Sequence, residues 1–301
     1  MEFRQIPSQE IDKNKWDACV RTHANGLIYA TTSYLNTMAE NWMGIVFGDY
    51  EAIMPIAWKI KYGIQYCYSI PFIQQLGLIG KEGTLNHSDI KDIILSITKY
   101  GDYNFNFLNS HIIHNDELKL CNNYILPLDD YHIIHQNYSS DLLSNLKKRE
   151  LKKILYGDGD INKALDIFYS LYHNRTPHVT KNDYENFRRL CHSLRSTGNA
   201  FVKQVVNSKS EILAIAIFFH DEKRIYNMAN STTDAGRKTG ANHLLFDELI
   251  HEYAGKNLIL DFEGSDIAGI KSFYEKFGAI NQPYFKWHFN KLPWPLRMFK
   301  R

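Results

Sequence analysis

The sequence lacks long apolar runs and paired cysteines, and each absence excludes a class of protein. No apolar run reaches the ~18–20 residues that a bilayer-spanning helix needs. The first ten residues contain no apolar signal segment, so the expectation is a cytoplasmic protein. No CxxC pair occurs, which favours buried, reduced thiols over a disulfide framework or a zinc site. The cysteines concerned are Cys19, Cys67, Cys121 and Cys191.

Basic and acidic residues are nearly equal in number, but they are unevenly distributed along the chain. The net charge is +2, with 44% hydrophobic and 23% charged residues, which excludes a disordered chain or a coiled-coil rod. Residues 1–138 hold 10 basic and 15 acidic residues, whereas residues 139–301 hold 25 and 18. This asymmetry indicates either an anionic ligand on the C-terminal half or a solvated basic surface.

Strand and helix patterns alternate along the whole chain. Its 301 residues predict roughly two domains. Each half has the order strand, helices, antiparallel strands, helix, strand, which indicates a mixed α/β fold. Polar residues interrupt the pattern at 128–140, so we expect an N-terminal domain over 1–135 and a C-terminal domain over 136–301. In the second half we expect one long helix over 237–253 and a closing strand over 284–289.

A polar turn followed by a basic helix start is the sharpest local pattern. Arg237, Lys238, Gly240 and Ala241 follow an expected strand and open the helix over 237–253. Free backbone N–H groups and the helix dipole at such a start favour a phosphate group. Glycine lets a ligand approach the backbone closely. An ordinary loop before a helix explains the same residues.

Three residues after that helix could carry acid–base chemistry. Asp261 and Glu263 alternate on an expected strand, so both side chains should face one side. Burial could raise the pKa of one of them and make it a general base. Both could equally be solvated residues that cap the next helix. Tyr274, on that next helix, could give a proton to a leaving group or could be a core aromatic.

Other residues are candidates for binding a substrate. Gln74 and Gln75 could hydrogen bond a polar substrate in a cleft between the domains. Tyr66 could form one wall of that cleft, although a half-buried sheet face predicts the same tyrosine. The basic helix with Lys147, Lys148, Arg149, Lys152 and Lys153 could contact tRNA or another phosphate, or could be a solvated face.

These patterns together resemble the GNAT acyltransferases. The matching features are a helix start at 237–242 that resembles the pattern R-x-x-G-x-(G/A), with Asn242 in its last position, and the later FYEKFG at 273–278. The whole chain more specifically resembles the FemABX-like double-GNAT group. The segments that carry this resemblance are IYATTSYLNTMAENW, PFIQQLG, SSDLLSNLKKRELKKI and LDFEGSDIAGIKSFYEKFGA.

The resemblance implies two tandem GNAT-like domains and an acyl-transfer activity. It places Arg237, Gly240 and Ala241 near the pyrophosphate of acyl-coenzyme A and makes Tyr274 the candidate acid. Members of the group transfer amino acids from aminoacyl-tRNA onto peptidoglycan precursors, or transfer acyl groups to amines.

We therefore expect an N-acyltransferase. Its donor would be acyl-CoA or, alternatively, aminoacyl-tRNA, and its acceptor an amine on a small molecule or a cell-wall precursor. No metal and no DNA are expected to take part. The apolar and basic segment 292–301 could touch a membrane surface weakly. The alternative hypothesis is a non-catalytic ligand- or RNA-binding protein with a degenerate donor site, which Asn242 and Ile267 favour.

Overall fold

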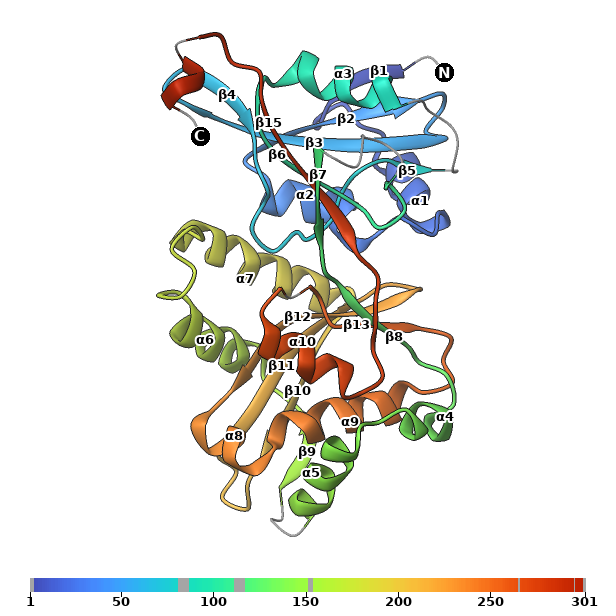
Figure 1. Ribbon diagram of the computed structural model, residues 1–301, viewed down its shortest axis with the longest axis vertical. Coiled ribbons are helices and arrows are strands. Elements are labelled where there is room, and N and C mark those ends of the chain that lie inside the picture. The colour runs from blue at the N-terminus through green and yellow to red at the C-terminus, as the bar shows by residue number, and fades with distance from the viewer. Residues whose placement is uncertain are drawn as a thin grey trace. The chain divides into compact units, whose positions relative to one another are not determined.

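The computed structural model describes residues 3–80, 87–110, 117–150, 154–264, 266–294 and 296–299. The chain forms two compact units (Figure 1). Unit 1 comprises residues 1–122 and 283–301, and unit 2 comprises residues 123–282. Each unit is built around its own mixed sheet.

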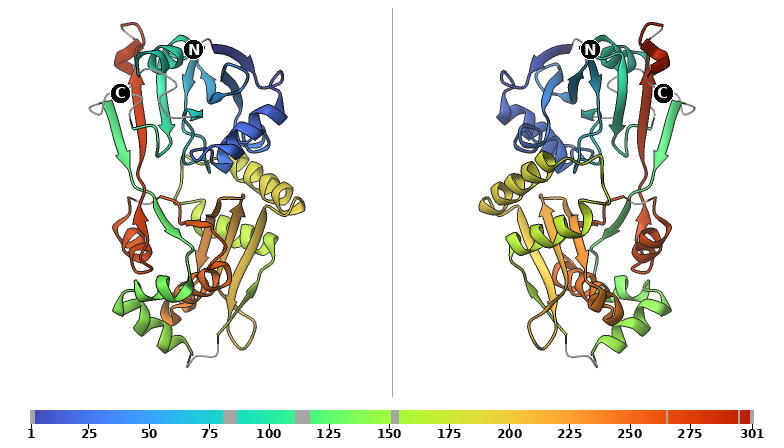
Figure 2. Two further views of the ribbon diagram at one scale, coloured as in Figure 1. Left: turned by 90° about the vertical axis from the view of Figure 1, so that its right-hand side faces the viewer. Right: turned by 90° about the vertical axis from the view of Figure 1, so that its left-hand side faces the viewer.

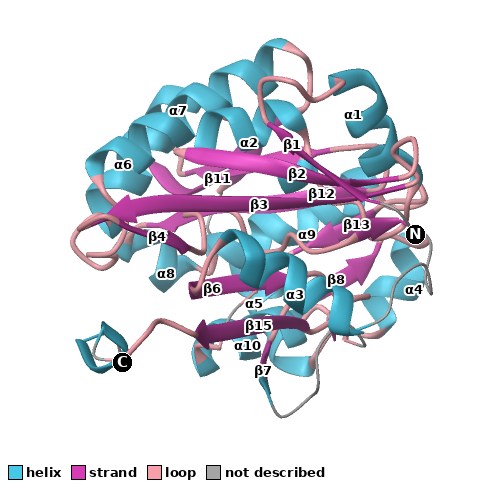
Figure 3. Cartoon of the chain, turned by 90° about the horizontal axis from the view of Figure 1, so that it is seen from above, coloured by secondary structure: helices cyan, strands magenta, loops and turns pink. Residues whose placement is uncertain are grey.

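The sheet of unit 1 has the strand order β1-β2-β3-β4-β6-β15-β7, with β5 also paired to β3. Figure 3 shows the long strand β3 beside β2, to which it is antiparallel. β4 and β6 form a parallel pair. The strands are β1 (Phe3–Pro7), β2 (Asn41–Phe47), β3 (Ala52–Lys61), β4 (Ile64–Cys67), β5 (Ile79–Gly80), β6 (Tyr100–Phe105), β7 (Leu118–Cys121) and β15 (Tyr284–Asn290). The helices are α1 (Lys13–Thr22), η1 (Ile28–Ala30), α2 (Thr32–Met38), α3 (His87–Ile97) and η3 (Leu296–Phe299).

Large aromatic side chains form the core of unit 1. Asp12 caps α1 by accepting hydrogen bonds from two backbone N–H groups of the first turn. The cap fixes where the helix begins, and Trp16 on its inner face is fully buried. The indole N–H of Trp16 donates to the carbonyl of Ala30 at 2.7 Å, so this buried polar atom is satisfied.

The strand β15 completes unit 1, not the C-terminal half of the chain. It pairs antiparallel with β6 on one side and with β7 on the other. Figure 2 shows it in red beside β7 in green. The expected strand over 284–289 is therefore present, but the prediction that it closes the second half was wrong. The partners of β15 are far from it in the sequence, so no local sequence pattern could predict this pairing.

The sheet of unit 2 has the order β14-β8-β13-β12-β11-β10-β9. Its strands are β8 (Tyr124–Pro127), β9 (Leu155–Asp158), β10 (Ala200–Val206), β11 (Ile212–His220), β12 (Arg224–Thr232), β13 (Ile259–Asp261) and β14 (Ile280–Asn281). Its helices are α4 (Tyr131–Gln136), α5 (Ser140–Glu150), α6 (Ile161–Tyr172), α7 (Lys181–Ser196), α8 (Asp234–Thr239), α9 (Ala241–Tyr253) and α10 (Ala268–Glu275).

Helices cover both faces of this second sheet. Phe218 and Phe219 are neighbours on β11, so their side chains point to opposite faces. Phe218 contacts Phe246 on α9, with ring centroids 6.1 Å apart. Phe219 contacts Phe187 on α7, at 5.9 Å. The sheet is therefore the middle layer of unit 2, which explains why β11 is almost continuously apolar.

Unit 2 begins earlier in the chain than the sequence pattern indicated. The expected boundary between residues 135 and 136 falls inside α4. The strand β8 precedes it and pairs antiparallel with β13, in the middle of unit 2. Within the described ranges, none of the helices is long and apolar enough to cross a membrane. In segment 292–301, part of which lies outside the described residues, Trp294 is 79% exposed.

Candidate active site

Two neighbouring strands of unit 2 separate and open the sheet. β12 and β13 pair in parallel only from Arg224 to Tyr226, where β13 ends at Asp261. β12 continues to Thr232, and a bulge at Met228 shifts its register against β11. The bulge breaks the alternation of side chains, so consecutive residues of β12 can face the same space. Backbone groups on this edge of β12 beyond Tyr226 have no ladder partner on β13.

A cavity of about 570 Å³ occupies this opening. Its volume lies in the range of small-molecule and cofactor sites. Apolar rings from α9, from the end of β13 and from α10 form part of its wall, namely Phe246, Phe262 and Phe273. Polar residues complete the lining, and those used below are Tyr172, Asn227, Asn230, Arg237, Gly240, Asn242, Glu263 and Tyr274.

The helix expected over 237–253 is divided in two at Gly240. This residue has φ 72°, in the left-handed region that favours glycine, and it ends α8 and begins α9. No side chain caps α9, which leaves the positive end of its dipole without a side-chain acceptor. Gly236 is required for a different reason: a Cβ there would lie 2.0 Å from the carbonyl oxygen of Leu213.

Two of the four predicted phosphate-binding residues line the cavity and two do not. Arg237 and Gly240 line the cavity. The Arg237 guanidinium donates to the carbonyl of Thr232 at 2.7 Å and pairs with Asp234, yet its side chain remains 57% exposed. Lys238 is exposed and is not among the lining residues. Ala241 is fully buried in the core beneath α9, so it contributes packing and backbone at the helix start.

Glu263 lies in the cavity wall just after the end of β13. Its φ of 65° places it in the left-handed region, an uncommon conformation for a residue other than glycine. Its backbone N–H donates to a carboxylate oxygen of Asp261 at 3.1 Å. Burial raises the pKa of the Glu263 carboxyl to about 8, because the charged form loses solvation there. A carboxyl with this pKa can exchange protons near neutral pH.

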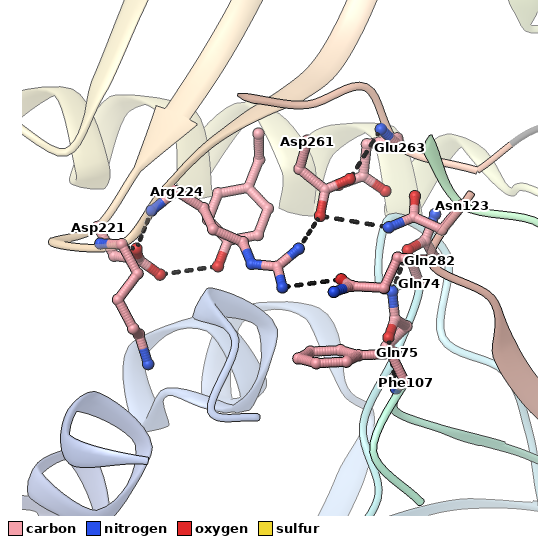
Figure 4. A network of polar contacts seen from close by, with 11 residues as sticks. Gln74, Gln75, Phe107, Asn123, Asp221, Arg224, Asp261, Glu263 and Gln282 are labelled. Atoms are coloured by element: carbon pink, nitrogen blue, oxygen red, sulfur yellow. Dashed lines mark hydrogen bonds and ion pairs between the residues drawn. The ribbon is translucent and has the colours of Figure 1, made fainter. Parts of the chain in front are cut away.

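Asp261 is held in a buried polar network and does not line the cavity (Figure 4). Its carboxylate accepts from the Arg224 guanidinium at 2.8 Å and from the Asn123 amide at 3.4 Å. Arg224 also donates to Gln282 at 2.9 Å. Burial raises the pKa of Asp261, and the Arg224 charge opposes that rise. The left-handed turn at Glu263 thus separates two carboxylates that simple strand alternation places side by side.

Tyr274 contributes its side chain from α10 to the cavity. It is 8% exposed, and its ring packs on Phe262 with centroids 4.6 Å apart. Burial raises the pKa of its hydroxyl well above the usual range, and the nearby Glu263 charge adds to the rise. A hydrogen bond with Asn227 opposes it. The Tyr274 hydroxyl therefore keeps its proton at neutral pH and can donate it in a hydrogen bond.

The three substrate-binding candidates of the first half lie in unit 1. Gln75 is fully buried; it donates to the Gln74 side chain at 2.6 Å and accepts from the backbone N–H of Phe107 at 3.1 Å. Tyr66, on β4, packs with Tyr68 and Tyr100 at centroid distances of 6.4 and 6.5 Å. All of these contacts of Gln74, Gln75 and Tyr66 lie within unit 1.

Sequence reasoning missed several amide side chains of the cavity. Asn230 donates to Asn242 at 2.9 Å, and the hydroxyl of Tyr172 donates to the carbonyl of Asn230 at 3.1 Å. Asn227 donates to the carbonyl of Phe262 at 3.3 Å. Asparagines are unfavourable inside strands, so their presence in the segment RIYNMANS at 224–231 was a usable signal.

The basic helix at 140–150 is α5, with Lys147 and Lys148 exposed. Lys152 and Lys153 lie outside the described residues, as does the side chain of Arg149. Within the described ranges, no group of three or more His, Cys, Asp or Glu side chains could hold a metal ion.

The sequence matches no protein-family model and no curated protein. Its structure, however, matches that of FemX with a TM-score of 0.67 and 13% sequence identity over 100% of both chains. The fold is that of FemX. L-PGS from Bacillus licheniformis matches this FemX-like fold with a TM-score of 0.55 and 11% identity, over 96% of this chain and 95% of that one. A GNAT-family acetyltransferase from Colwellia psychrerythraea matches with a TM-score of 0.54 and 11% identity, over 96% and 100%.

The FemX-like fold confirms the fold expected from the sequence. The chain has a mixed α/β architecture consistent with tandem GNAT-like domains, and its resemblance to the FemABX-like group holds at the level of the fold. This is an acyltransferase-type fold. Since folds host many activities, the function has to be argued from the cavity of unit 2.

Proposed function

We propose that the protein is an N-acyltransferase that moves an acyl or aminoacyl group to an amine acceptor. The observation that carries this proposal is that Glu263 and Tyr274, a carboxyl with a raised pKa and a protonated phenol, line one cavity. An amide-forming transfer needs these two functions: a base for the amine proton and an acid for the leaving group. The acyltransferase-type fold supports the same conclusion.

The donor is proposed to bind along α9 and the Phe-lined wall. The uncapped start of α9 at Gly240 and the Arg237 guanidinium would attract a pyrophosphate. The phenylalanine side chains would pack on the apolar part of the donor. Acyl-CoA combines both features in one molecule. Aminoacyl-tRNA is the alternative donor; it offers phosphates to the same helix start and to the exposed lysines of α5.

The proposed reaction needs no covalent intermediate. The amine nitrogen attacks the carbonyl carbon of the donor, and the new C–N bond forms as negative charge develops on the oxygen. Backbone N–H groups on the free edge of β12 are candidates for stabilising that charge. Glu263 takes the proton from the nitrogen. The bond to the leaving sulfur or oxygen breaks, and Tyr274 gives that atom its proton.

Unit 1 is proposed to bind the acceptor or to support the catalytic unit. The acceptor amine would belong to a small molecule or a cell-wall precursor. The proposed site of action is the cytoplasm, where both candidate donors are found.

The test is a thermal-shift titration with coenzyme A, acetyl-CoA and charged tRNA as separate probes. A ligand that binds only the folded state stabilises it by ~2.7 kcal/mol at a hundredfold excess over its dissociation constant. We expect a shift with acetyl-CoA that Arg237→Ala reduces and that Arg195→Ala, an exposed position on α7, leaves unchanged. A salt-sensitive shift with charged tRNA alone would select the alternative donor. No shift with any of the three probes would contradict the proposed donor site.

A further inference from the structure

The hairpin between β3 and β4 presents an aromatic side chain to solvent. Its two-residue turn consists of Tyr62 and Gly63, with φ of 55° and 75°. Such left-handed turn positions favour Gly, Asn and Asp, so a tyrosine there costs the turn some stability. The Tyr62 side chain is 87% exposed, and Ile60, at the end of β3, is 63% exposed. Packing within unit 1 therefore does not explain why the turn carries a tyrosine.

The segment that follows β15 lies at the same end of this sheet. Cys67 of β4, Gly101 of β6 and Phe289 of β15 are aligned across three neighbouring strands. From this row, β4 leads back to the hairpin turn, and β15 leads on to Lys291, whose N–H donates to the carbonyl of Lys99 at 2.7 Å. Figures 1 and 3 show the turn and η3 on one side of unit 1.

This segment also exposes apolar side chains. Trp294 is 79% exposed and Leu296 is 44% exposed, whereas other tryptophans of unit 1, Trp16, Trp42 and Trp287, are at most 4% exposed. Exposed apolar side chains gathered at one place on a surface mark a site of interaction. We call the four residues concerned the apolar tip of unit 1: Ile60, Tyr62, Trp294 and Leu296.

The charges next to the apolar tip are basic. Residues 58–68 and 284–301 contain no aspartate or glutamate. The acidic side chains of Glu40 and Asp102 form ion pairs within unit 1, with lysines of β3 and β15. The basic residues that are exposed here are Lys61, Lys99, Lys291 and Arg297. This end of the sheet therefore combines apolar side chains with a positive charge, which is complementary to an anionic surface.

We propose that the apolar tip of unit 1 docks on a bilayer that contains anionic lipids. Tyrosine and tryptophan favour the headgroup level of a membrane, where the ring and its polar atom both find partners. Ile60 and Leu296 enter the boundary of the acyl chains, and the basic side chains stay at the lipid phosphates. RNA fits this surface less well, because its phosphates and bases would leave the two aliphatic side chains in water. The inference does not depend on the proposed acyl transfer.

The experiment is flotation of the full chain with lipid vesicles. One set of vesicles is phosphatidylcholine alone, and the other is an equal mixture of phosphatidylcholine and phosphatidylglycerol. We expect the protein to float with the mixed vesicles and to be released as NaCl is raised, because salt screens the attraction of the lysines. The emission of Trp294 should shift to the blue on binding, and Trp294→Ser should lose that shift and weaken binding.

Two variants of the hairpin test the surface itself. Tyr62→Asn suits the left-handed turn and should weaken vesicle binding by about tenfold or more without loss of stability. Lys61→Glu should weaken binding to the mixed vesicles by more than roughly fivefold, the effect of one basic residue near an anionic surface. The matched controls lie in unit 2: Leu155→Asn replaces a 63% exposed strand residue, and Lys209→Glu an exposed lysine beside a hairpin turn. Neither control should change binding.

The outcomes decide the proposal. No flotation with the mixed vesicles, or equal flotation with both kinds at any salt concentration, would overturn it. Vesicle binding that Tyr62→Asn and Trp294→Ser leave unchanged would overturn the choice of this surface. Light scattering and filter binding with charged tRNA complete the test. A dimer or an RNA complex that Tyr62→Asn abolishes, with no vesicle binding, would assign the apolar tip to that partner instead. If Tyr62→Asn does not fold by circular dichroism, the Trp294 emission of the wild-type protein still decides the question.

Discussion

The two units contain the same kind of opening, but unit 1 closes it with its own chain. In unit 1 the parallel strands β4 and β6 are in register only at Cys67 and Gly101. Beyond that point Leu76 forms a bridge with Phe105, and its N–H donates to the carbonyl of Asn104 at 3.0 Å. The cavity that remains there is about 10 Å³, against about 570 Å³ in unit 2.

The asparagines of the two openings show the same difference. In unit 1 the amides of Asn106 and Asn109 both donate to the carbonyl of Leu78, at 3.0 and 3.1 Å. Asn109 also accepts from the N–H of Leu78 at 2.9 Å. In unit 2 the Oδ1 of Asn227 has no such partner among the described residues. The asparagine amides of unit 1 are thus paired within the unit, whereas one buried acceptor of unit 2 has no partner among the described residues.

The sharpest test of this comparison is removal of the acid–base group from the open cavity. Glu263→Gln should lower kcat by ~10²–10⁴-fold, the usual contribution of a general base. In the wild-type protein kcat/KM should rise with pH up to about 8, the pKa of Glu263, since the base must be deprotonated. Rate measurements from pH 6 to 10 should show that the variant loses this dependence.

The same variant has a stability signature that does not depend on substrate. Because the folded pKa of Glu263 is raised from 4.5 to about 8, the folded state binds the extra proton between these values. The free energy of unfolding contributed by this group therefore falls as pH rises from about 4.5 to about 8. Glu263→Gln should flatten that fall, whereas Glu275→Gln, on the exposed side of α10, should not. A wild-type protein without the fall would contradict the raised pKa.

A second test distinguishes the role of the cavity residues from that of the buried polar network around Asp261. Asp261→Asn removes the partner of Arg224 where both side chains are buried, at 1% and 4% exposure. An uncompensated buried charge costs ~3–5 kcal/mol of unfolding free energy, measurable by urea denaturation. Asp141→Asn, which removes a 62% exposed partner of Lys276, should leave the free energy of unfolding nearly unchanged. If Asp261→Asn is fully stable but inactive, Asp261 and not Glu263 is the base.

The smallest effect is expected from loosening the closed opening of unit 1. Gln75→Leu removes the acceptor of the Phe107 N–H and should cost ~1–3 kcal/mol of unfolding free energy. We expect an unchanged KM for the acceptor, because the Gln75 side chain is occupied within unit 1. A raised KM at unchanged stability would instead place Gln75 on the substrate, as the sequence suggested.

Local patterns in the sequence were sufficient for one part of the site. The R-x-x-G pattern indicated two residues that line the same cavity, Arg237 and Gly240. Only Gly240 lies at a helix start, because Arg237 belongs to the last turn of α8. The separate positions of the Asp261 and Glu263 side chains could not be predicted in this way. Strand alternation placed both on one face, and only the left-handed φ of Glu263 and the distant partner Arg224 separate them.

The fold class was predictable, whereas the composition of unit 1 was not. Hydrophobic periodicity identifies strands and helices one at a time, and their order was enough to suggest tandem domains. It does not say that β15 joins a sheet whose other strands lie before residue 122. Nor does it reveal that an asparagine of β12 faces a cavity, because that depends on a bulge and on where β13 ends.

The place of β15 also sets an order of assembly during synthesis. Unit 2 is one continuous segment, and its two ends meet where the N–H of Gln282 donates to the carbonyl of Asn123 at 2.7 Å. It can therefore fold as soon as the ribosome has released residue 282. Unit 1 emerges first but lacks an inner strand until residues 284–290 follow. Unit 2 is thus expected to mature before the unit that precedes it on the ribosome, against the usual N-to-C direction of domain folding.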